Sequence, residues 1–475
     1  MDFLNWLMYF VFYLILFQAF HLITRRKLGR FHKLPPGPPT IPIFGNLFQV
    51  GDKPHRSLAK LAKIHGDIMT LKLGHNTTVV FSSATMAKEI LQKHDAVSCN
   101  RTIPDALRAL QHHEAGLPWM PVSTTWRNLR KICNLHIFAT QKLDANQYLR
   151  RSKVEQLLAG VRESSLIGEA IEIRQAAFKT TLSLISNTIF SIDLVDSTHT
   201  SEEFREIVQG IMEELGKPNF GDYFPIANLD LQGIRRRVAI LLRKMMDLFD
   251  KMVDERMELR KMNDYISTDD FLDILLQLIH QGNNGKLDRN LIKHLILVAQ
   301  SRQLQVLWNG QWRNYSKTQK FCRKRGELKQ IIGEGNLLEE SNITCLPYLQ
   351  AIVKETMRLH PSLPLLLPRK AEADIEIHSF VIPKGTQLLI NAWAIGRDPK
   401  FWEEPDLFRP ERFIRSEMDV KGRDFGLIPF GGGRRICPGL PLAIRMLHLM
   451  LGGLIHSFGW KLENNITPES LDMKD

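Results

Sequence analysis

The sequence predicts one large, mainly helical domain with a small β-sheet region, preceded by an N-terminal transmembrane helix. Three observations support this prediction. Apolar residues recur at spacings of three and four along most of the chain after residue 40, as on the buried face of a helix. Strand-like runs are few and short, and we find no internal repeat or low-complexity tract. The third observation is an uncharged apolar run at the N-terminus.

That run extends from Phe3 to Ile23 and contains no Lys, Arg, Asp or Glu. About 20 such residues span a bilayer as a helix. Four basic residues follow directly (Arg25, Arg26, Lys27 and Arg30), so the positive-inside rule places the body of the protein on the cytoplasmic side. A cleaved signal peptide is the alternative, but its basic residues usually precede the apolar region. We therefore expect residues 1–24 to be a membrane anchor.

The next segment, residues 25–40, is basic and then rich in proline, with the run Leu34-Pro35-Pro36-Gly37-Pro38-Pro39. Consecutive prolines fix φ and lack N–H donors, so this stretch predicts a stiff, extended hinge rather than a helix. Residues 41–475 then form a single domain.

Within this domain the apolar spacing predicts helices, and a few short strand-like runs predict strands. The expected helices cover residues 56–66, 84–94, 124–134, 148–163, 203–216, 236–262, 346–360 and 440–451. The expected strands are Ile68–Leu73, Thr78–Phe81, Ile375–Ile377 and Gln387–Ile390.

The net charge of +12 permits an acidic partner, but the basic residues are scattered among acids. Such a surface suits an acidic redox protein or anionic lipid as well as nucleic acid, and no motif favours nucleic acid. The five cysteines are Cys99, Cys133, Cys322, Cys345 and Cys437. They are far apart and form no CxxC pair, which argues against a zinc site or a disulfide framework.

Cys437 lies in a glycine-rich loop, Phe430-Gly431-Gly432-Gly433-Arg434-Arg435-Ile436-Cys437-Pro438-Gly439, ahead of a predicted helix. Backbone N–H groups at a helix start would hydrogen-bond a thiolate and keep it ionised. Arg435 would pair with a carboxylate of a bound ligand. The alternative is a glycine-rich turn with an incidental buried cysteine.

The pattern F-x-x-G-x-R-x-C-x-G in this loop resembles the haem-binding loop of the cytochrome P450 family, which implies Phe430, Gly433, Arg435, Cys437 and Gly439 as haem-binding residues. Other motifs of that family follow in the same order. Trp126 and Arg130 match its W-x-x-x-R helix near a haem propionate, and Pro368-Arg369 matches a further propionate contact.

Two further motifs are structural in that family. Glu355 and Arg358 match the E-x-x-R helix, where one helical turn lets the two side chains pair. Arg412 lies in Pro410-Glu411-Arg412-Phe413, which resembles the family's P-E-R-F segment and would complete a Glu-Arg-Arg cluster.

The resemblance covers nearly the whole chain. Within the family, the sequence is most similar to plant microsomal members, in particular the geraniol 8-hydroxylase-like group. It implies the cytochrome P450 fold, haem b (iron protoporphyrin IX) with Cys437 as the catalytic iron ligand, and hydroxylation of a small lipophilic, monoterpenoid-like substrate. It also implies electrons from NADPH through a membrane reductase, and a single-pass location in the endoplasmic reticulum membrane with the catalytic domain facing the cytoplasm. His112 and His113 fall near the substrate by the same resemblance, although lone histidines are more often packing residues.

The resemblance is interrupted at residues 299–325. The family has there a central helix with an A-G-x-D/E-T-T/S segment, whose acid and threonine relay protons. Arg302 and Gln303 stand at those positions, so we assign no proton-relay residue. With permitted codons, Gln303–Lys324 read one base earlier gives TTSSTLEWAMEELLKNPEVLSK, an ordinary family sequence, which indicates a local disturbance of the reading frame.

The chain also stops short of the family's usual C-terminal strands. Two interpretations therefore stay open. The first is a working monooxygenase whose sequence is misread at the central helix. The second is a catalytically dead or misfolded pseudoenzyme, because a broken central helix would remove a layer of core worth far more than the net stability of about 5–15 kcal/mol.

Overall fold

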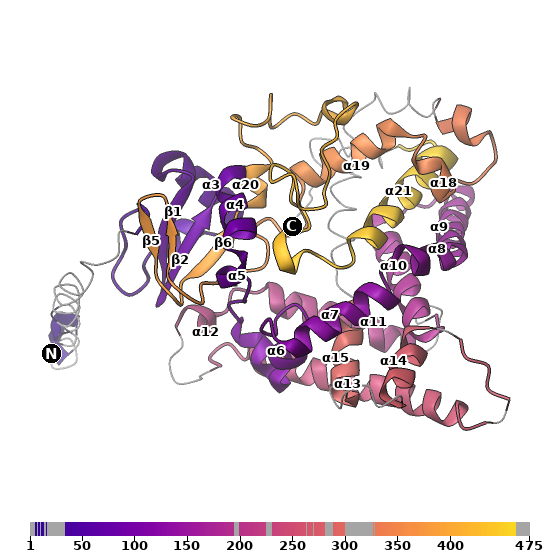
Figure 1. The fold of residues 1–475 in the computed structure, drawn as a ribbon, viewed down its shortest axis with the longest axis horizontal. Helices are drawn as coiled ribbons and strands as arrows, with labels where there is room; N and C mark the ends of the chain where they lie inside the picture. The colour runs from indigo at the N-terminus through magenta and orange to yellow at the C-terminus, as the bar shows by residue number, and fades with distance from the viewer. Residues whose placement is uncertain are drawn as a thin grey trace.

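The computed structural model describes residues 34–193, 199–224, 230–262, 264–268, 270–280, 288–299, 326 and 328–461, together with isolated residues between 5 and 16. Within these residues the chain is mainly helical, with two small sheets gathered at one side and the long helices at the other (Figure 1). The predicted mainly helical domain with a small sheet region is therefore confirmed, and the N-terminal transmembrane helix stays a prediction.

The larger sheet has the strand order β1-β2-β6-β3, formed by β1 (Ile68–Leu73), β2 (Asn76–Phe81), β6 (Gln387–Ile390) and β3 (Arg369–Lys370). β1 and β2 form an antiparallel hairpin, β2 pairs parallel with β6, and β3 pairs antiparallel with β6. The smaller sheet is the hairpin of β4 (Ile375–Ile377) and β5 (Phe380–Ile382). The four strands expected from the sequence are all present, and the two that were missed, β3 and β5, have only 2 and 3 residues.

The helices in chain order are α2 (Leu47–Val50), α3 (Pro54–His65), α4 (Ala84–Lys88), the π-helical η2 (Glu89–Lys93), α5 (Asp95–Ser98), the 3₁₀ segment η3 (Asp105–Gln111), α6 (His112–Ala115), α7 (Thr124–His136), α8 (Thr140–Ala145), α9 (Gln147–Ile167), α10 (Ile173–Phe190), α11 (His199–Gly216), α12 (Phe220–Tyr223), α13 (Ile234–Leu259), α14 (Phe271–His280), α15 (Arg289–Ala299), α18 (Glu340–Ile343), α19 (Pro347–Leu359), α20 (Ala392–Ile395), the 3₁₀ turns η4 (Pro410–Phe413) and η5 (Gly433–Arg435), and α21 (Leu440–Ser457).

Local sequence signals fix several helix ends. The Ser123 hydroxyl accepts the Trp126 backbone N–H at 3.1 Å and so caps α7. Pro54 opens α3, and Gly66 with φ of 104° ends it. In α19, Pro347 stands in the first turn, where a missing N–H costs no hydrogen bond. These signals place the helices close to the ranges that the apolar spacing predicts.

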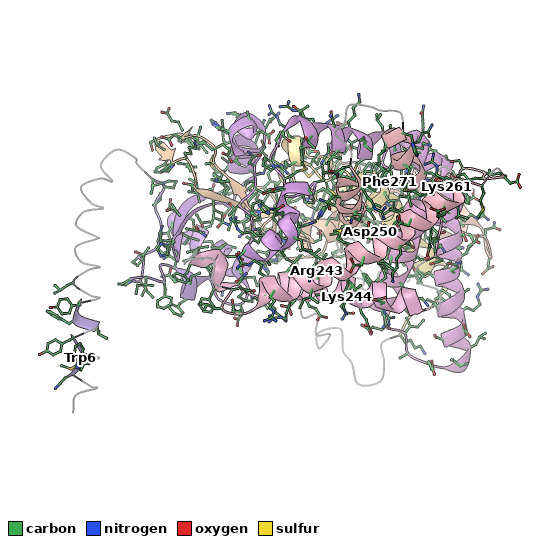
Figure 2. The ribbon with its side chains drawn as sticks, turned by 90° about the horizontal axis from the view of Figure 1, so that it is seen from below. Trp6, Arg243, Lys244, Asp250, Lys261 and Phe271 are labelled. Carbon is green, nitrogen blue, oxygen red and sulfur yellow. The ribbon has the colours of Figure 1, made fainter. Side chains whose placement is uncertain are left out.

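Two apolar cores frame the Cys437 loop. One core packs α9, α10, α19 and α21 together, and Phe430 belongs to it. The other joins η3 and α7 to α10, α11, α13, α14 and α15. α13 follows the edge of this second core, with exposed Arg243 and Lys244 along its outer face and buried Phe271 of α14 beside it (Figure 2).

α10 is the largest helix that the sequence analysis missed. It is buried against α9 on one side and α14 on another, and it belongs to both cores. A helix with apolar neighbours on more than one side has no single apolar stripe, so the three- and four-residue spacing does not reveal it.

Among the described residues, one helix is long and apolar enough to cross a membrane, α21, and most of it is buried inside the protein. It follows the Cys437 loop and belongs to the core. The expected N-terminal anchor falls mostly outside the described residues, as does the central segment 300–325.

Candidate active site

The Cys437 loop is a turn whose two ends are joined by a backbone hydrogen bond. The Cys437 backbone N–H donates to the Phe430 carbonyl at 3.1 Å, which brings the two ends of the glycine run together. Gly431 and Gly433 take φ values of 74° and 68°, a left-handed conformation that other residues adopt only with strain. The loop thus presents the sulfur at the start of α21.

The Cys437 sulfur experiences opposing effects. Burial raises the pKa of the thiol, whereas the backbone N–H groups of Gly439 and Leu440 and the charge of Arg130 lower it. Gly439 and Leu440 form the N-terminus of α21, where free N–H groups and the helix dipole favour an anion. Burial has the largest effect, so the pKa of the free Cys437 thiol is raised overall, and the N–H groups and Arg130 are the features that would stabilise its thiolate form on a metal. Cys133 is also buried, and burial raises its pKa to about 12, so it is an inert thiol.

No group of three or more His, Cys, Asp or Glu side chains within the described part of the chain could hold a metal ion. A single thiolate that belongs to no such group in this part of the chain is compatible with haem, which would bring its own nitrogen ligands to the iron.

Trp126 and Arg130 lie one turn apart on α7, beside the Cys437 loop. The Arg130 guanidinium donates to the Ile436 carbonyl, next to Cys437, and stands 5.9 Å from the centre of the Trp126 ring. The Trp126 indole N–H donates to the Leu117 carbonyl at 3.0 Å. The two residues thus link α7 to both the Cys437 loop and the segment before α7.

Arg435 points into the segment between residues 99 and 120. Its guanidinium donates to the carbonyls of Cys99 at 2.9 Å and Met120 at 2.6 Å, and it stacks on Trp126 at 5.0 Å from the ring centre. Burial lowers the pKa of Arg435 to about 10. The neighbouring Arg369 and Arg130 charges act in the same direction, and Cys99 opposes them. The sequence predicts that Arg435 pairs with a carboxylate of a bound ligand. That carboxylate would accept hydrogen bonds from Arg435 in addition to these carbonyls or in place of them.

Arg369 at the start of β3 is buried and bonds to three groups. It donates to the Asp95 carboxylate at 3.0 Å, the Gly432 carbonyl at 2.9 Å and the Ser98 carbonyl at 3.5 Å. The structure therefore places Arg369 against the Cys437 loop itself, which the sequence motif alone did not indicate.

Sequence analysis missed Arg101. Its Nε is buried without a hydrogen-bond partner, and its pKa is lowered well below the ordinary value by burial and by the charges of Arg369 and Arg435. A single arginine in a loop carries no spacing signal, so only the fold reveals it. Together Arg101, Arg130, Arg369 and Arg435 form what we term the arginine cluster.

The arginine cluster concentrates more positive charge than its one carboxylate partner, Asp95, balances. Buried guanidinium groups with an orphaned donor favour an anionic ligand. The two propionates of haem would supply the missing negative charge. The donor set and the thiolate environment of Cys437 thus both fit haem.

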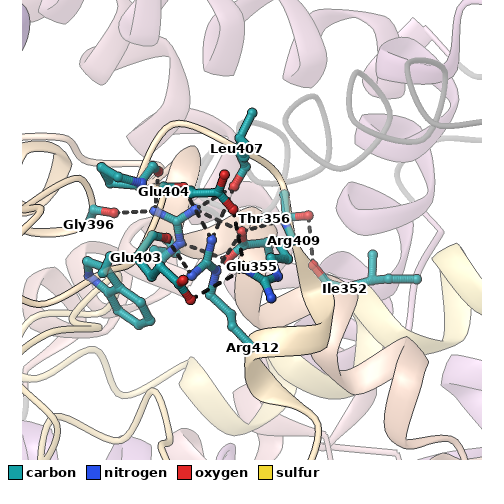
Figure 3. Close-up of polar contacts among 12 residues, drawn as sticks. Ile352, Glu355, Thr356, Gly396, Glu403, Glu404, Leu407, Arg409 and Arg412 are labelled. Carbon is teal, nitrogen blue, oxygen red and sulfur yellow. Dashed lines mark hydrogen bonds and ion pairs between the residues drawn. The ribbon is translucent and has the colours of Figure 1, made fainter.

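Glu355, Arg358 and Arg412 form a second, buried ion cluster between α19 and η4 (Figure 3). Arg358 donates to both oxygens of Glu355, at 2.6 and 2.8 Å, and Arg412 Nε donates to Glu355 Oε1 at 3.1 Å. Arg358 also donates to the carbonyls of Gly396, Pro405 and Leu407, and both arginines lie over the Trp402 ring. The cluster thus ties α19 to η4 and to the long connection before it.

His112 and His294 form a pair that joins α6 to α15. Their Nδ1 atoms lie 2.7 Å apart, and burial lowers the pKa of His112 to about 3 and that of His294 to about 4. Both rings are therefore neutral at physiological pH and act as packing residues. The positions expected for the proton relay, Arg302 and Gln303, lie outside the described residues.

Comparison with known proteins identifies the family of this chain. The family model described as Cytochrome P450 matches residues 35–299 and 315–474. Geraniol 8-hydroxylase of Catharanthus roseus is 46% identical over 484 residues, covering 100% of this chain and 96% of that protein. Geraniol 8-hydroxylase of Swertia mussotii is 45% identical over 483 residues, covering 100% of this chain and 96% of that protein. Drimenol monooxygenase of Persicaria hydropiper is 48% identical over 450 residues, covering 93% of this chain and 89% of that protein.

Proposed function

Because this chain belongs to the cytochrome P450 family of monooxygenases, we propose that it hydroxylates a small terpenoid with Cys437 as the axial ligand of haem b. The observation that carries the proposal is the position of the Cys437 sulfur at the N-terminus of α21, where two backbone N–H groups and Arg130 oppose the effect of burial and would stabilise a thiolate bound to iron. Haem bound through a thiolate supplies activation of O₂ for insertion of one oxygen atom into a C–H bond.

The chain's own residues would bind and orient this group. The arginine cluster would hold the propionates, and Trp126 would support it by stacking under Arg435 and Arg130. The α21 N-terminus would keep the Cys437 thiolate ionised. The Glu355–Arg358–Arg412 cluster holds α19 and η4 in place and does not touch the ligand loop directly.

The substrate class is proposed from the relatives. Two proteins similar over the whole chain carry the name geraniol 8-hydroxylase, and a third is named drimenol monooxygenase. A monoterpenoid alcohol such as geraniol is therefore the first substrate to test. Electrons would come from NADPH through a membrane-bound reductase, and the net charge of +12 suits an acidic partner of this kind.

The membrane anchor is part of the same proposal. The side chains of Trp6, Tyr9, Phe12 and Tyr13 in the apolar N-terminal run are 57–75% exposed (Figure 2). The globular domain adds an exposed apolar patch near its first described residues: Ile41, Ile43, Phe44, Phe48 and Phe220. Apolar patches of this kind suit a membrane surface. We place the protein in the endoplasmic reticulum membrane, with one span and the catalytic domain on the cytoplasmic side.

Turnover tests the proposed function. Membranes containing the full chain and a plant NADPH-dependent reductase would be supplied with geraniol and O₂. A hydroxylated product that depends on NADPH is the expected result, and Cys345→Ser, a change at an exposed cysteine, should keep it. Haem-loaded protein that forms no product from geraniol or from drimenol would refute the substrate class.

A second candidate is a catalytically inactive relative of these enzymes. It is supported by the interruption of the family match between residues 299 and 315, inside the segment where the sequence departs from the family pattern. Sequencing the transcript across codons 290–330 separates the two candidates. A message that encodes a TTSSTLEWA-like helix supports the working hydroxylase, whereas a message that encodes the residues printed above supports the inactive relative.

A further inference from the structure

Asp95 is a buried carboxylate to which the sequence motifs assign no role. It stands at the start of α5, 7% exposed, and bonds to two segments far away in the sequence. One is the start of β3 and the other is the Cys437 loop. Both belong to the candidate active site.

The contacts of Asp95 hold the Cys437 loop on both sides of Gly433. Its Oδ2 accepts the backbone N–H of Arg434 at 3.1 Å. Its Oδ1 accepts Nη1 of Arg369 at 3.0 Å, and Nη2 of Arg369 donates to the Gly432 carbonyl at 2.9 Å. The carboxylate therefore binds the loop once directly and once through Arg369.

Gly433 fits between these contacts because it has no side chain. A Cβ at this position would lie within 3.0 Å of Asp95 Oδ1 and of the Leu91 carbonyl. The φ of 68° adds strain for any other residue. The glycine of the family motif is thus explained by close packing against Asp95 and η2.

Asp95 also partly balances the arginine cluster. Besides Arg369, its charge acts favourably on Arg101 and on Arg435, and the Arg434 guanidinium lies 3.4 Å from Oδ2. Loss of this charge would leave several buried guanidinium groups with less compensation.

We infer that Asp95 is a positioning residue that clamps the Gly432–Cys437 loop and so fixes the Cys437 sulfur relative to the arginine cluster. The clamp itself is a property of the chain. Its meaning for catalysis rests on the proposed haem-thiolate function.

Amide hydrogen exchange tests the clamp with or without haem. In the full chain, Asp95→Ala should raise the exchange rates of the Arg434 and Cys437 amides by at least about tenfold, because the loop loses its direct bond to Asp95 and Arg369 loses the carboxylate that holds it against Gly432. Exchange in α9 serves as the internal reference for global opening. The matched control is Asp270→Ala, which removes a carboxylate of equal burial that pairs with Arg256 of α13 at 2.8 Å and lies away from the loop.

Loop exchange that does not rise in Asp95→Ala, or that rises only as much as exchange in α9, would overturn the inference. In haem-loaded protein, Asp95→Asn should also shift the reduction potential of the iron to more positive values, because one negative charge beside the Cys437 loop is lost. Asp270→Asn should leave that potential unchanged. Absence of haem binding by the unmodified chain would contradict the proposed function but would leave the exchange test of the clamp intact.

Discussion

Glu355 provides the strongest test of how the fold is held together. Its carboxylate is 0% exposed and accepts four hydrogen bonds, two from Arg358, one from Arg412 and one from the Arg409 backbone N–H at 2.7 Å. Removal of one partner of a buried ion pair costs about 3–5 kcal/mol, because the remaining charge stays buried. Arg358 keeps three backbone carbonyl acceptors, which limits the loss.

Two substitutions separate charge from hydrogen bonding. Glu355→Gln keeps the volume and one acceptor oxygen, so it should cost about 3–5 kcal/mol. Glu355→Ala also leaves the Arg409 N–H without an acceptor, which adds about 1–3 kcal/mol. The sum is comparable to the net stability of about 5–15 kcal/mol, so Glu355→Ala should yield little folded protein.

Urea unfolding followed by tryptophan fluorescence measures this cost. Trp402 is buried beside Arg358, with the guanidinium 5.2 Å from its ring centre, and reports on the cluster directly. The control is Glu334→Gln, which breaks an exposed ion pair with Lys329 and should change stability by less than about 1 kcal/mol. An equal urea midpoint for Glu355→Gln and the unmodified chain would refute the structural role of the cluster.

Three further predictions follow from single contacts. Gly433→Ala should disrupt the Cys437 loop and abolish haem binding, because its Cβ would clash with Asp95 and Leu91. The control is Gly385→Ala: Gly385 has a φ of 86° but no neighbour within 4 Å, so the change should cost only about 1–2 kcal/mol of backbone strain. Haem content and the urea unfolding midpoint are measured for both variants. Gly452→Ala should destabilise α21 by about 1–3 kcal/mol, because its Cβ would meet Leu338, while Gly453→Ala has ordinary contacts and should be tolerated in the same unfolding assay. Burial lowers the pKa of His448 to about 4 in the folded protein. The imidazole of the unfolded chain therefore becomes protonated at a higher pH than that of the folded chain, and the free energy of unfolding falls as the pH drops from about 6.5 towards 4. His448→Leu should reduce this loss, measured as the difference between the urea midpoints at about pH 7 and about pH 5.

Much of the fold could be predicted from the sequence because it depends on local signals. Short strand-like runs predicted β1 and β6 with their observed bounds, and the apolar stripe of α19 predicted that helix within one residue at each end. α10 was missed because it is buried on several sides, and β3 because a strand of 2 residues has no pattern of its own.

The candidate site also contains residues that the sequence predicted and residues that it did not. The spacing of Glu355 and Arg358 predicted an ion pair on one helix face, and the structure contains it. Asp95 and Arg101 gave no signal, because their partners lie hundreds of residues away in the sequence and meet them only in the folded chain. The haem-contacting roles of Trp126, Arg130 and Arg435 stay predictions that a haem-bound structure would test.

The measurement closest to the central claim is the carbon-monoxide difference spectrum of the reduced full chain, recorded beside Cys437→Ser and Cys345→Ser. The account predicts a thiolate-type Soret band in the unmodified chain and in Cys345→Ser, and none in Cys437→Ser. A thiolate-type band that survives in Cys437→Ser would contradict the assignment of Cys437 as the iron ligand.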